Sequence, residues 1–316
     1  MLAVLIPLSA APSAFAEEIS RYSGLCDASA AAALGPNHFV VADDERNTLQ
    51  VYRRGRARPV MSIPLAGFLD TKTDKESDLE AAATLGSRIY WISSHARNSR
   101  GEFQDRRHRF FATRFRSGAT PQLATVGTPY RDLLADLIKA DTAFGYGLEK
   151  ASRLPPEAPG GLNIEGLAAT PDGGLIIGLR NPVPGGRALV IPLENPSDLL
   201  EGNKARFGKP IELDLGGRGV RSIERVGSHY LVVAGPAGDR GTFALYRWSG
   251  HPGDAAGLIS GIDFGDLRPE ALFTVPNSDL VQILSDDGGV ETNGIACKDR
   301  PKATQSFRSA LFKRRG

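Results

Sequence analysis

A weak internal repeat constrains the fold of this chain more than any other sequence feature. Each copy is an apolar strand, a tight turn rich in Gly, Pro, Asn or Asp, and a second apolar strand. About five copies can be recognised, and their first strands begin near Asp27, Glu80, Glu165, Arg221 and Glu270. A further strand with aromatic or branched residues follows each pair, at 49–52, 109–115, 188–191, 243–248 and 307–312.

The spacing of the copies indicates the architecture. Three to four strands per unit, repeated at roughly 45–55 residues, are typical of the blades of a β-propeller. The five anchor residues are separated by 53, 85, 56 and 49 residues. We therefore predict an all-β protein, a β-propeller with five blades, or six if a degenerate blade lies in the long interval. A two-sheet β-sandwich is the alternative, but it does not require one hairpin to recur with an acidic start.

The long interval contains an insertion at 128–161. Leu133, Leu134, Leu137 and Ile138 have helical spacing, so we predict one short helix there. The Pro/Gly-rich stretch 154–161 that follows is predicted to be a loop. The last copy lacks a fourth strand at its C-terminal side, and residues 19–23 could supply it, which would close the ring and remove a sheet edge.

The N-terminus carries a targeting signal. Residues 2–14 are apolar and small but too few to span a bilayer, and Ala14-Phe15-Ala16 fits a signal-peptidase site. We predict that 1–16 is a signal peptide and that 17–316 is a single β-propeller domain of a periplasmic or secreted protein. No Lys or Arg precedes the apolar run, and a buried N-terminal strand is the alternative. No other stretch is apolar enough to span a membrane.

Two cysteines, Cys26 and Cys297, lie close to the two ends of the predicted mature chain. An even number in an exported protein permits one disulfide, which here would tie the termini of a circular fold together. Two free thiols are the alternative.

The charge of the chain argues against a nucleic-acid partner. The net charge is +2, and the sequence has no clustered excess of basic residues of the kind that nucleic-acid binding needs. We expect a monomer whose partner is a polar or anionic small molecule.

The direction of the strands predicts where the polar residues gather. A tight turn makes the two strands of each copy antiparallel, so the start of the first and the end of the second share one rim of the channel. Three interpretations of this rim remain open. Carboxylates and arginines could pair across blades as structural salt bridges. Ca²⁺ could bind the oxygen ligands of Glu80, Asn163, Glu165 and Glu270. An anion could bind Arg97, Asn98, Arg180, Asn181, Arg221 and Arg268.

Sharper catalytic motifs are absent. The sequence has no G-x-S-x-G, H-E-x-x-H or C-x-x-C, which argues against an α/β-hydrolase elbow and a zinc site. His95 is the one histidine at the predicted rim, where it could act as a general base or be a hydrogen-bonded structural residue. Glu165 is the second candidate catalytic residue. The charged loop 99–109 is expected to cover the same rim.

Several segments together resemble a bacterial family of exported proteins of unknown function. These are Ser77-Asp78-Leu79-Glu80, the run from Trp91 to Asn98, Asn163-Ile164-Glu165-Gly166-Leu167 and Gly178-Leu179-Arg180-Asn181-Pro182. The resemblance covers nearly the whole mature chain and implies a propeller-like fold. More loosely, Asn163-Ile164-Glu165-Gly166 is similar to the N-x-E-G element of esterase-like phytases. It is also similar to the P-E-G element of gluconolactonase and strictosidine-synthase-like propellers, which implies a cation-binding role for Glu165. Arg268-Pro269-Glu270-Ala271 departs from P-E-G, and Arg221 replaces a carboxylate.

These observations lead to one functional hypothesis and one alternative. We expect an exported propeller with a mixed carboxylate and arginine small-molecule site at the channel mouth. Such a site could be a Ca²⁺-dependent hydrolase of an ester, lactone or phosphoester, in which a rim carboxylate deprotonates a metal-activated water. The alternative is a non-catalytic binding or scaffold propeller, so the sequence leaves open whether the protein is an enzyme.

Overall fold

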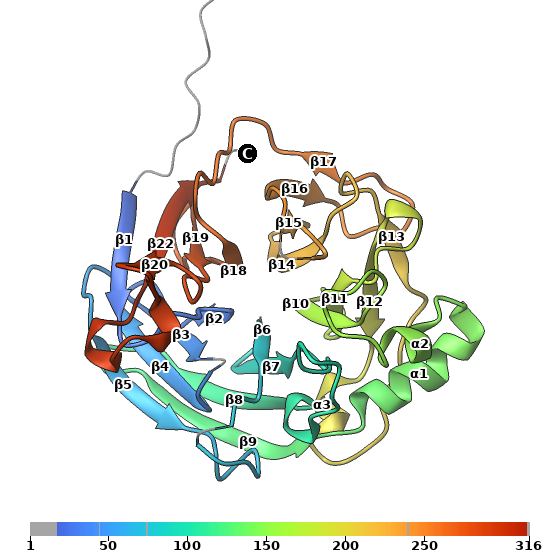
Figure 1. Cartoon of the computed structure of the whole chain (residues 1–316), viewed down its shortest axis with the longest axis horizontal. Coiled ribbons are helices and arrows are strands. Elements are labelled where there is room, and N and C mark those ends of the chain that lie inside the picture. The colour runs from blue at the N-terminus through green and yellow to red at the C-terminus, as the bar shows by residue number, and fades with distance from the viewer. Residues whose placement is uncertain (1–17, 44, 74, 239, 315–316) are drawn as a thin grey trace, which may run out of the picture.

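The described strands form five antiparallel sheets of four strands, arranged in a ring around a central axis (Figure 1). The computed structural model describes residues 18–314 except 44, 74 and 239. The prediction of an all-β propeller is confirmed, with five blades rather than six. The predicted signal peptide, 1–16, lies outside the described residues. Within them, no helix is both long and apolar enough to cross a membrane.

The first four blades each run outward in chain order from the innermost strand. Blade 1 is β2 (Ala30–Ala33), β3 (His38–Asp43), β4 (Thr48–Arg53) and β5 (Pro59–Pro64). Blade 2 is β6 (Leu79–Leu85), β7 (Arg88–Ser93), β8 (Phe110–Arg116) and β9 (Gln122–Tyr130). Blade 3 is β10 (Asn163–Ala169), β11 (Leu175–Asn181), β12 (Ala188–Leu193) and β13 (Ile211–Leu213). Blade 4 is β14 (Gly219–Val226), β15 (His229–Gly235), β16 (Ala244–Trp248) and β17 (Gly257–Leu258).

Blade 5 joins the two ends of the chain. It consists of β18 (Pro269–Thr274), β19 (Leu280–Ser285), β22 (Ser306–Lys313) and, on the outside, β1 (Glu18–Ser23). β1 pairs with β22 in antiparallel register, with Ile19 opposite Ala310 (Figure 1). The predicted closure by residues 19–23 is therefore present. A small hairpin of β20 (Glu291–Thr292) and β21 (Ile295–Ala296) lies between β19 and β22.

The helical content is small and concentrated in the long interval. The helices are α1 (Leu133–Phe144), α2 (Leu148–Ala151) and α3 (Pro196–Leu199), with short 3-10 turns at Asp105–Arg107, Pro184–Gly186, Cys297–Asp299 and Lys302–Thr304. Leu133 and Leu137 of α1 are buried in the core shared by blades 2 and 3, as their spacing predicts. α1 begins after Tyr130 because β9 uses the preceding residues as the outer strand of blade 2. This explains the long interval without a sixth blade.

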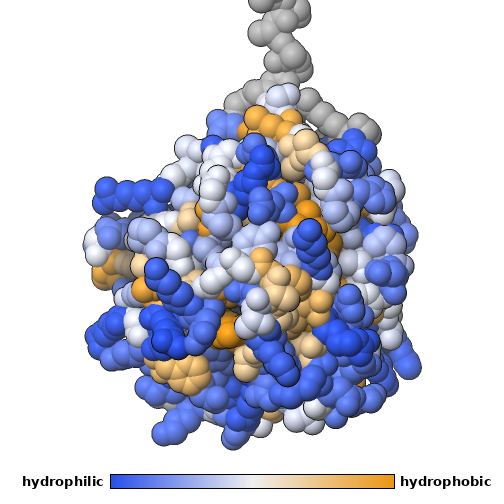
Figure 2. All heavy atoms as spheres, turned by 90° about the vertical axis from the view of Figure 1, so that its right-hand side faces the viewer, coloured by the Kyte–Doolittle hydropathy of each residue, from blue (hydrophilic) through white to orange (hydrophobic). Residues whose placement is uncertain are grey.

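The hydrophobic core consists of five clusters, each shared by two neighbouring blades. Aromatic pairs fill the closure between blades 5 and 1, where Tyr22 of β1 lies edge-on to Phe39 and stacks against Phe307. Seen from the side of α1 and α2, the surface is mostly hydrophilic, with small hydrophobic patches between charged residues (Figure 2). Such scattered apolar exposure is normal for a folded surface.

Candidate functional site

The same irregularity occurs in the inner hairpin of blades 2, 3, 4 and 5. Pairing between the first two strands skips one residue near the start of the innermost strand, which is a β-bulge. The skipped residues are Glu80, Glu165, Arg221 and Glu270. A bulge redirects a side chain and is common beside functional sites. The bulges therefore place these four polar side chains at equivalent positions around one mouth of the channel.

Three of the bulge residues form a buried charge network across blades 3, 4 and 5. Arg221 Nε lies 2.8 Å from Glu165 Oε2, and its Nη2 contacts Glu270 Oε1. Glu270 Oε2 also accepts a hydrogen bond of 3.3 Å from Ser29 Oγ of blade 1. All three charged side chains are almost fully buried. A buried charge is costly unless it is paired, and here each carboxylate is paired with a guanidinium group.

Glu165 is the centre of this network. Its Oε1 accepts hydrogen bonds from Arg180 Nη1 at 3.0 Å and from Asn163 Nδ2 at 2.9 Å. The Arg180 guanidinium also donates to the carbonyl oxygens of Pro236 and Gly238, in the loop after β15. Two arginines and an amide therefore surround the carboxylate. The interpretation of the rim as structural salt bridges fits Glu165, Arg221 and Glu270 directly.

The carboxylates of blade 2 lie on another side of the mouth. Asp78 pairs with Arg107 Nη1 at 3.0 Å, and Arg107 also contacts Glu76. Burial is the main cause that raises the pKa of Glu80 well above its ordinary value, and the charges of Asp78 and Glu165 add to it. Burial also raises the pKa of Asp78, although the charge of Arg107 opposes the shift, so both carboxyl groups are biased toward their protonated forms.

A cavity of about 990 Å³ opens at the mouth between blades 3, 4 and 5. Arg180, Arg221 and Glu270 of the network line its inner wall, and Arg268 precedes β18 at its edge. Arg240, in the loop after β15, and Lys298 line it from other sides. Its size falls within the usual range of small-molecule pockets.

Two arginines of this cavity differ from the others in their ion pairs. Arg180 and Arg221 are held by Glu165, but the exposed guanidinium groups of Arg240 and Arg268 make no ion pair or side-chain hydrogen bond within the described part of the chain. A guanidinium group presents a planar set of donors that matches a carboxylate or a phosphate. The cavity therefore offers two exposed cationic groups that form no ion pair with the described residues.

A pair of aspartates lines the same cavity. Asp27, which is nearly buried, is hydrogen-bonded to Asp286. Burial above all, and then the neighbouring charge of Asp286, raises the pKa of Asp27 to about 9. A Cβ atom at Gly288 would lie 1.6 Å from Asp27 Oδ1, so only glycine leaves room for this side chain. Near neutral pH Asp27 is therefore biased toward its protonated form, beside the carboxyl group of Asp286.

The raised pKa of Asp27 predicts a pH-dependent stability. The folded chain keeps a proton up to about pH 9 that the unfolded chain releases near the ordinary aspartate pKa of 3.8. The favourable contribution is thus complete below the unfolded pKa and is lost as the pH rises toward the folded pKa. Relative to wild type, Asp27→Asn should gain unfolding free energy between pH 5 and 9 at up to about 1.4 kcal/mol per pH unit. Urea unfolding of both proteins across this range measures it; parallel curves would show that Asp27 titrates normally.

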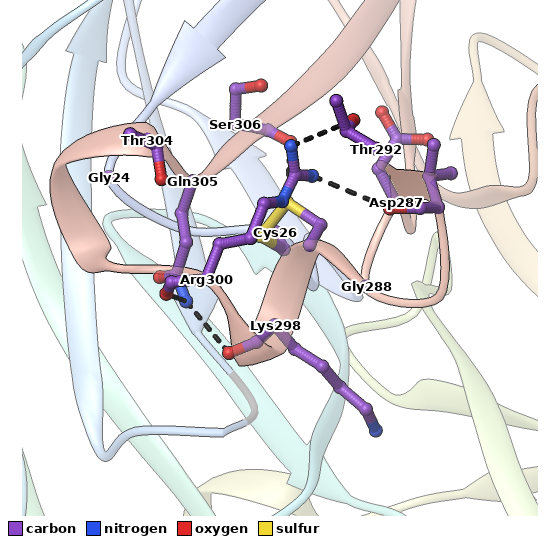
Figure 3. Close-up of a disulfide and its surroundings, with 12 residues drawn as sticks. Gly24, Cys26, Asp287, Gly288, Thr292, Lys298, Arg300, Thr304, Gln305 and Ser306 are labelled. Atoms are coloured by element: carbon purple, nitrogen blue, oxygen red, sulfur yellow. Dashed lines mark hydrogen bonds between the residues drawn. A yellow bond between two sulfur atoms is a disulfide. The ribbon is translucent and has the colours of Figure 1, made fainter. Parts of the chain in front are cut away.

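The disulfide holds one wall of this cavity. Cys26 and Cys297 are bonded, which confirms the predicted pairing and excludes the two free thiols. The residues that follow them, Asp27 and Lys298, both line the cavity. Figure 3 shows the Lys298 side chain extending away from the disulfide, while Gln305 donates to the Lys298 carbonyl oxygen at 3.0 Å. The covalent bond between the chain ends therefore also fixes part of the site.

The predicted site residues separate into two groups. Arg180, Arg221, Arg268 and Glu270 line the cavity, with Glu165 and Asn163 directly behind them. His95, Arg97, Asn98 and Asn181 are not among its lining residues. Arg97 donates to the carbonyl oxygens of Gly101 and Ser152, Asn98 binds within the loop to Glu102, and Asn181 donates to Pro156 and Ala158.

His95 is buried rather than exposed at the rim. It is 1% exposed, and its Nδ1 lies 2.8 Å from the carbonyl oxygen of Ser93. Burial and the neighbouring His108 lower the pKa of His95 to about 3, so its ring is neutral near pH 7. A general base is most effective when its pKa is near the working pH. The geometry described for His95 therefore matches the hydrogen-bonded structural alternative better than the catalytic one.

Sequence reasoning missed four residues of the cavity. Asp27 and Asp286 are far apart in the sequence, so nothing in the sequence indicates that they form a pair. Lys298 lies beside a cysteine and Arg240 in a loop outside the repeat, and neither has a sequence signal.

The described geometry adds no support for the predicted calcium site. The carboxylates of Glu165 and Glu270 already bind Arg221, and the Asn163 amide already donates to Glu165. Among the residues that the structure describes, no group of three or more His, Cys, Asp or Glu side chains could hold a metal ion. We therefore derive no catalytic step through a metal.

The fold and the mouth together define a class: a five-bladed β-propeller with a charged pocket beside its channel. The family described as "Protein of unknown function (DUF3616)" matches residues 120–278, just over half of the chain. The protein belongs to this family. The predicted membership of a propeller family of unknown function is confirmed. No curated protein matches the chain.

Solved structures resemble the chain only in fold. The glutaminyl cyclase of Myxococcus xanthus is 13% identical over 95% of this chain and 98% of its own, with a TM-score of 0.46. A protein of Thermus thermophilus, provisionally described as an oxidoreductase (glucose dehydrogenase), is 15% identical over 93% and 99%, with a TM-score of 0.46. The Cps50 (Swd1) β-propeller domain of Myceliophthora thermophila is 9% identical over 95% and 99%, with a TM-score of 0.43.

Proposed function

We propose that the mouth cavity binds a small molecule with carboxylate or phosphate groups. The observation that carries this proposal is the pair of arginines, Arg240 and Arg268, whose guanidinium groups line the cavity without an ion pair among the described residues. Arg221, which is paired with Glu165 and Glu270, lines the same cavity. A hydrogen bond between charged groups contributes about 1.5–3 kcal/mol, so two such arginines can select an anion.

The binding proposal predicts a specific pattern of affinities. Arg268→Ala and Arg240→Ala should each weaken the binding of citrate or inorganic phosphate by about tenfold or more, since each removes a charge-assisted interaction. Arg58→Ala is the matched control, because Arg58 is an exposed arginine on the outer side of blade 1, away from the cavity. Titration calorimetry at low salt measures the affinities. Equal losses in all three variants would point to bulk charge and refute a site.

Hydrolysis of an ester, lactone or phosphoester is a second candidate function, favoured by the Asp27–Asp286 pair. The Asp286 carboxylate would take a proton from water as it attacks the carbonyl or phosphoryl centre. Protonated Asp27 would donate its proton to the departing oxygen. Arg268 and Arg240 would hold the substrate's anionic group and stabilise the negative charge that develops.

One experiment separates this reaction from binding alone. A panel of anionic esters, lactones and phosphoesters is assayed with wild type and Asp286→Asn, with EDTA and with added Ca²⁺. Turnover that Asp286→Asn abolishes while citrate affinity stays constant would support catalysis. Loss of turnover with EDTA and recovery with Ca²⁺ would support the predicted metal requirement. Absence of turnover on every compound would leave a non-catalytic binding propeller.

We further propose that the protein works as a monomer in the periplasm or outside the cell. The disulfide is compatible with export, since such bonds persist in oxidising compartments. Cell fractionation and sedimentation of the purified protein test these two points. A chain found in the cytoplasm, or a dimer at micromolar concentration, would contradict them.

A further inference from the structure

A second cavity, of about 450 Å³, lies between blades 4 and 5 at the end opposite the channel mouth. His229, at its rim, begins β15, whereas the mouth cavity is lined by the loop that follows the end of β15 at Gly235. Lys313, also at the rim, ends β22. This site is therefore distinct from the one described above.

The wall of this cavity is apolar. Its buried lining comes from four strands of the two blades, namely Leu231, Leu245, Val281, Ile283 and Phe312. Within the described residues, no buried polar side-chain atom that lacks a partner belongs to the lining. Ordered water in a cavity needs polar partners, so these walls suit a hydrocarbon better than water.

The rim of the cavity is basic. Arg247 Nη2 lies 3.5 Å from His229 Nδ1, and Arg314 is close enough for its charge to act on the same imidazole. Burial first, and then the charges of Arg247 and Arg314, lower the pKa of His229. The other charged groups in the lining are Lys313 and Asp279. One carboxylate therefore faces two arginines and a lysine, which leaves the rim complementary to an anion.

We propose that this cavity binds a free single-chain amphiphile with an anionic head group, of the fatty-acid type. The alkyl chain lies between Leu231 and Leu245 on blade 4 and Val281, Ile283 and Phe312 on blade 5. The carboxylate lies at the rim beside Arg247 and Arg314. A free chain fits better than a bilayer lipid, because the cavity is a gap between two blades rather than an exposed surface. The assignment is independent of the function proposed for the mouth.

Calorimetry with octanoate, decanoate, decanol and decyltrimethylammonium, all below their micellar concentrations, tests this assignment. Each added methylene should raise the affinity about fourfold, so decanoate should bind roughly 16-fold more tightly than octanoate. Decanoate should also bind more tightly than decanol and much more tightly than the cationic amphiphile. Equal affinity for octanoate and decanoate, or for decanoate and decyltrimethylammonium, would overturn the proposal.

Variants distinguish decanoate binding in this cavity from binding in the mouth cavity and from association with a second copy of the chain. Ile283→Trp should fill the cavity and abolish binding, and the double variant Arg247→Ala/Arg314→Ala should remove the preference for decanoate over decanol without filling the cavity. Arg268→Ala, at the mouth, should leave decanoate affinity unchanged. Loss of decanoate binding in Arg268→Ala would place the ligand at the mouth instead. A dimer that the double variant dissociates, without decanoate binding, would show a second copy on this surface and overturn the proposal.

Discussion

Glu165→Gln is expected to lower the free energy of unfolding by about 3–5 kcal/mol, because removal of one partner leaves buried charges unpaired. Glu165 is 3% exposed, and its two oxygens receive Arg180, Arg221 and Asn163. A neutral amide can replace the shape of the carboxylate but not its charge, so both guanidinium groups would remain buried with reduced compensation. Urea unfolding followed by circular dichroism measures the difference.

Glu224→Gln is the matched control for this prediction. Glu224 is on β14, the neighbouring innermost strand, and its Oε1 accepts hydrogen bonds of 3.1 Å from the backbone N–H and the hydroxyl group of Thr274. A glutamine oxygen can accept the same two bonds, so the expected loss is below about 1 kcal/mol. If Glu165→Gln cost no more than Glu224→Gln, the charge network would not be what holds blades 3, 4 and 5 together at the mouth.

Removal of the disulfide is expected to have an effect of similar size. The bond joins residues 271 positions apart, so it restricts almost the entire unfolded chain. The double variant Cys26→Ser/Cys297→Ser should lose about 2–5 kcal/mol of unfolding free energy. Guanidinium unfolding of the oxidised wild type, the reduced wild type and the double variant gives the comparison.

The reduced wild type serves as the control, because it lacks the bond but keeps both side chains. Its unfolding free energy should match that of the double variant within about 1 kcal/mol, the usual size of a conservative side-chain change. The pairing of β1 with β22 remains in both proteins and should keep the ring closed in the absence of denaturant. Identical unfolding of oxidised and reduced wild type would mean that β1 alone closes the propeller.

The fold could be predicted from the sequence because it depends on local patterns. Each hairpin is encoded by a short apolar run, a turn and another run, and repetition of this unit implies the ring. Closure of the ring by residues 19–23 could be predicted because the last copy of the repeat lacks a fourth strand. The number of blades was harder, because the residues after β9 could be read as a degenerate blade until α1 and α2 accounted for them.

The site was only partly predictable, because it depends on contacts between distant segments. The repeat placed Glu165, Arg221 and Glu270 at one mouth, but the bulges that direct them toward one another have no sequence signature. The sequence left salt bridges, a metal and an anion as alternatives for one set of residues. In the structure the buried arginines pair with carboxylates, whereas Arg268 at the edge of the mouth remains available.

The most direct test of the anion site is a crystal structure of the protein grown with selenate, a divalent oxyanion that anomalous scattering locates. We expect selenate in the mouth cavity, with its oxygens within hydrogen-bond distance of the Arg268 and Arg240 guanidinium groups. The Arg268→Ala variant, grown under the same conditions, should lack it. Selenate bound at other surface arginines while the mouth of the wild type contains none would contradict the proposed function.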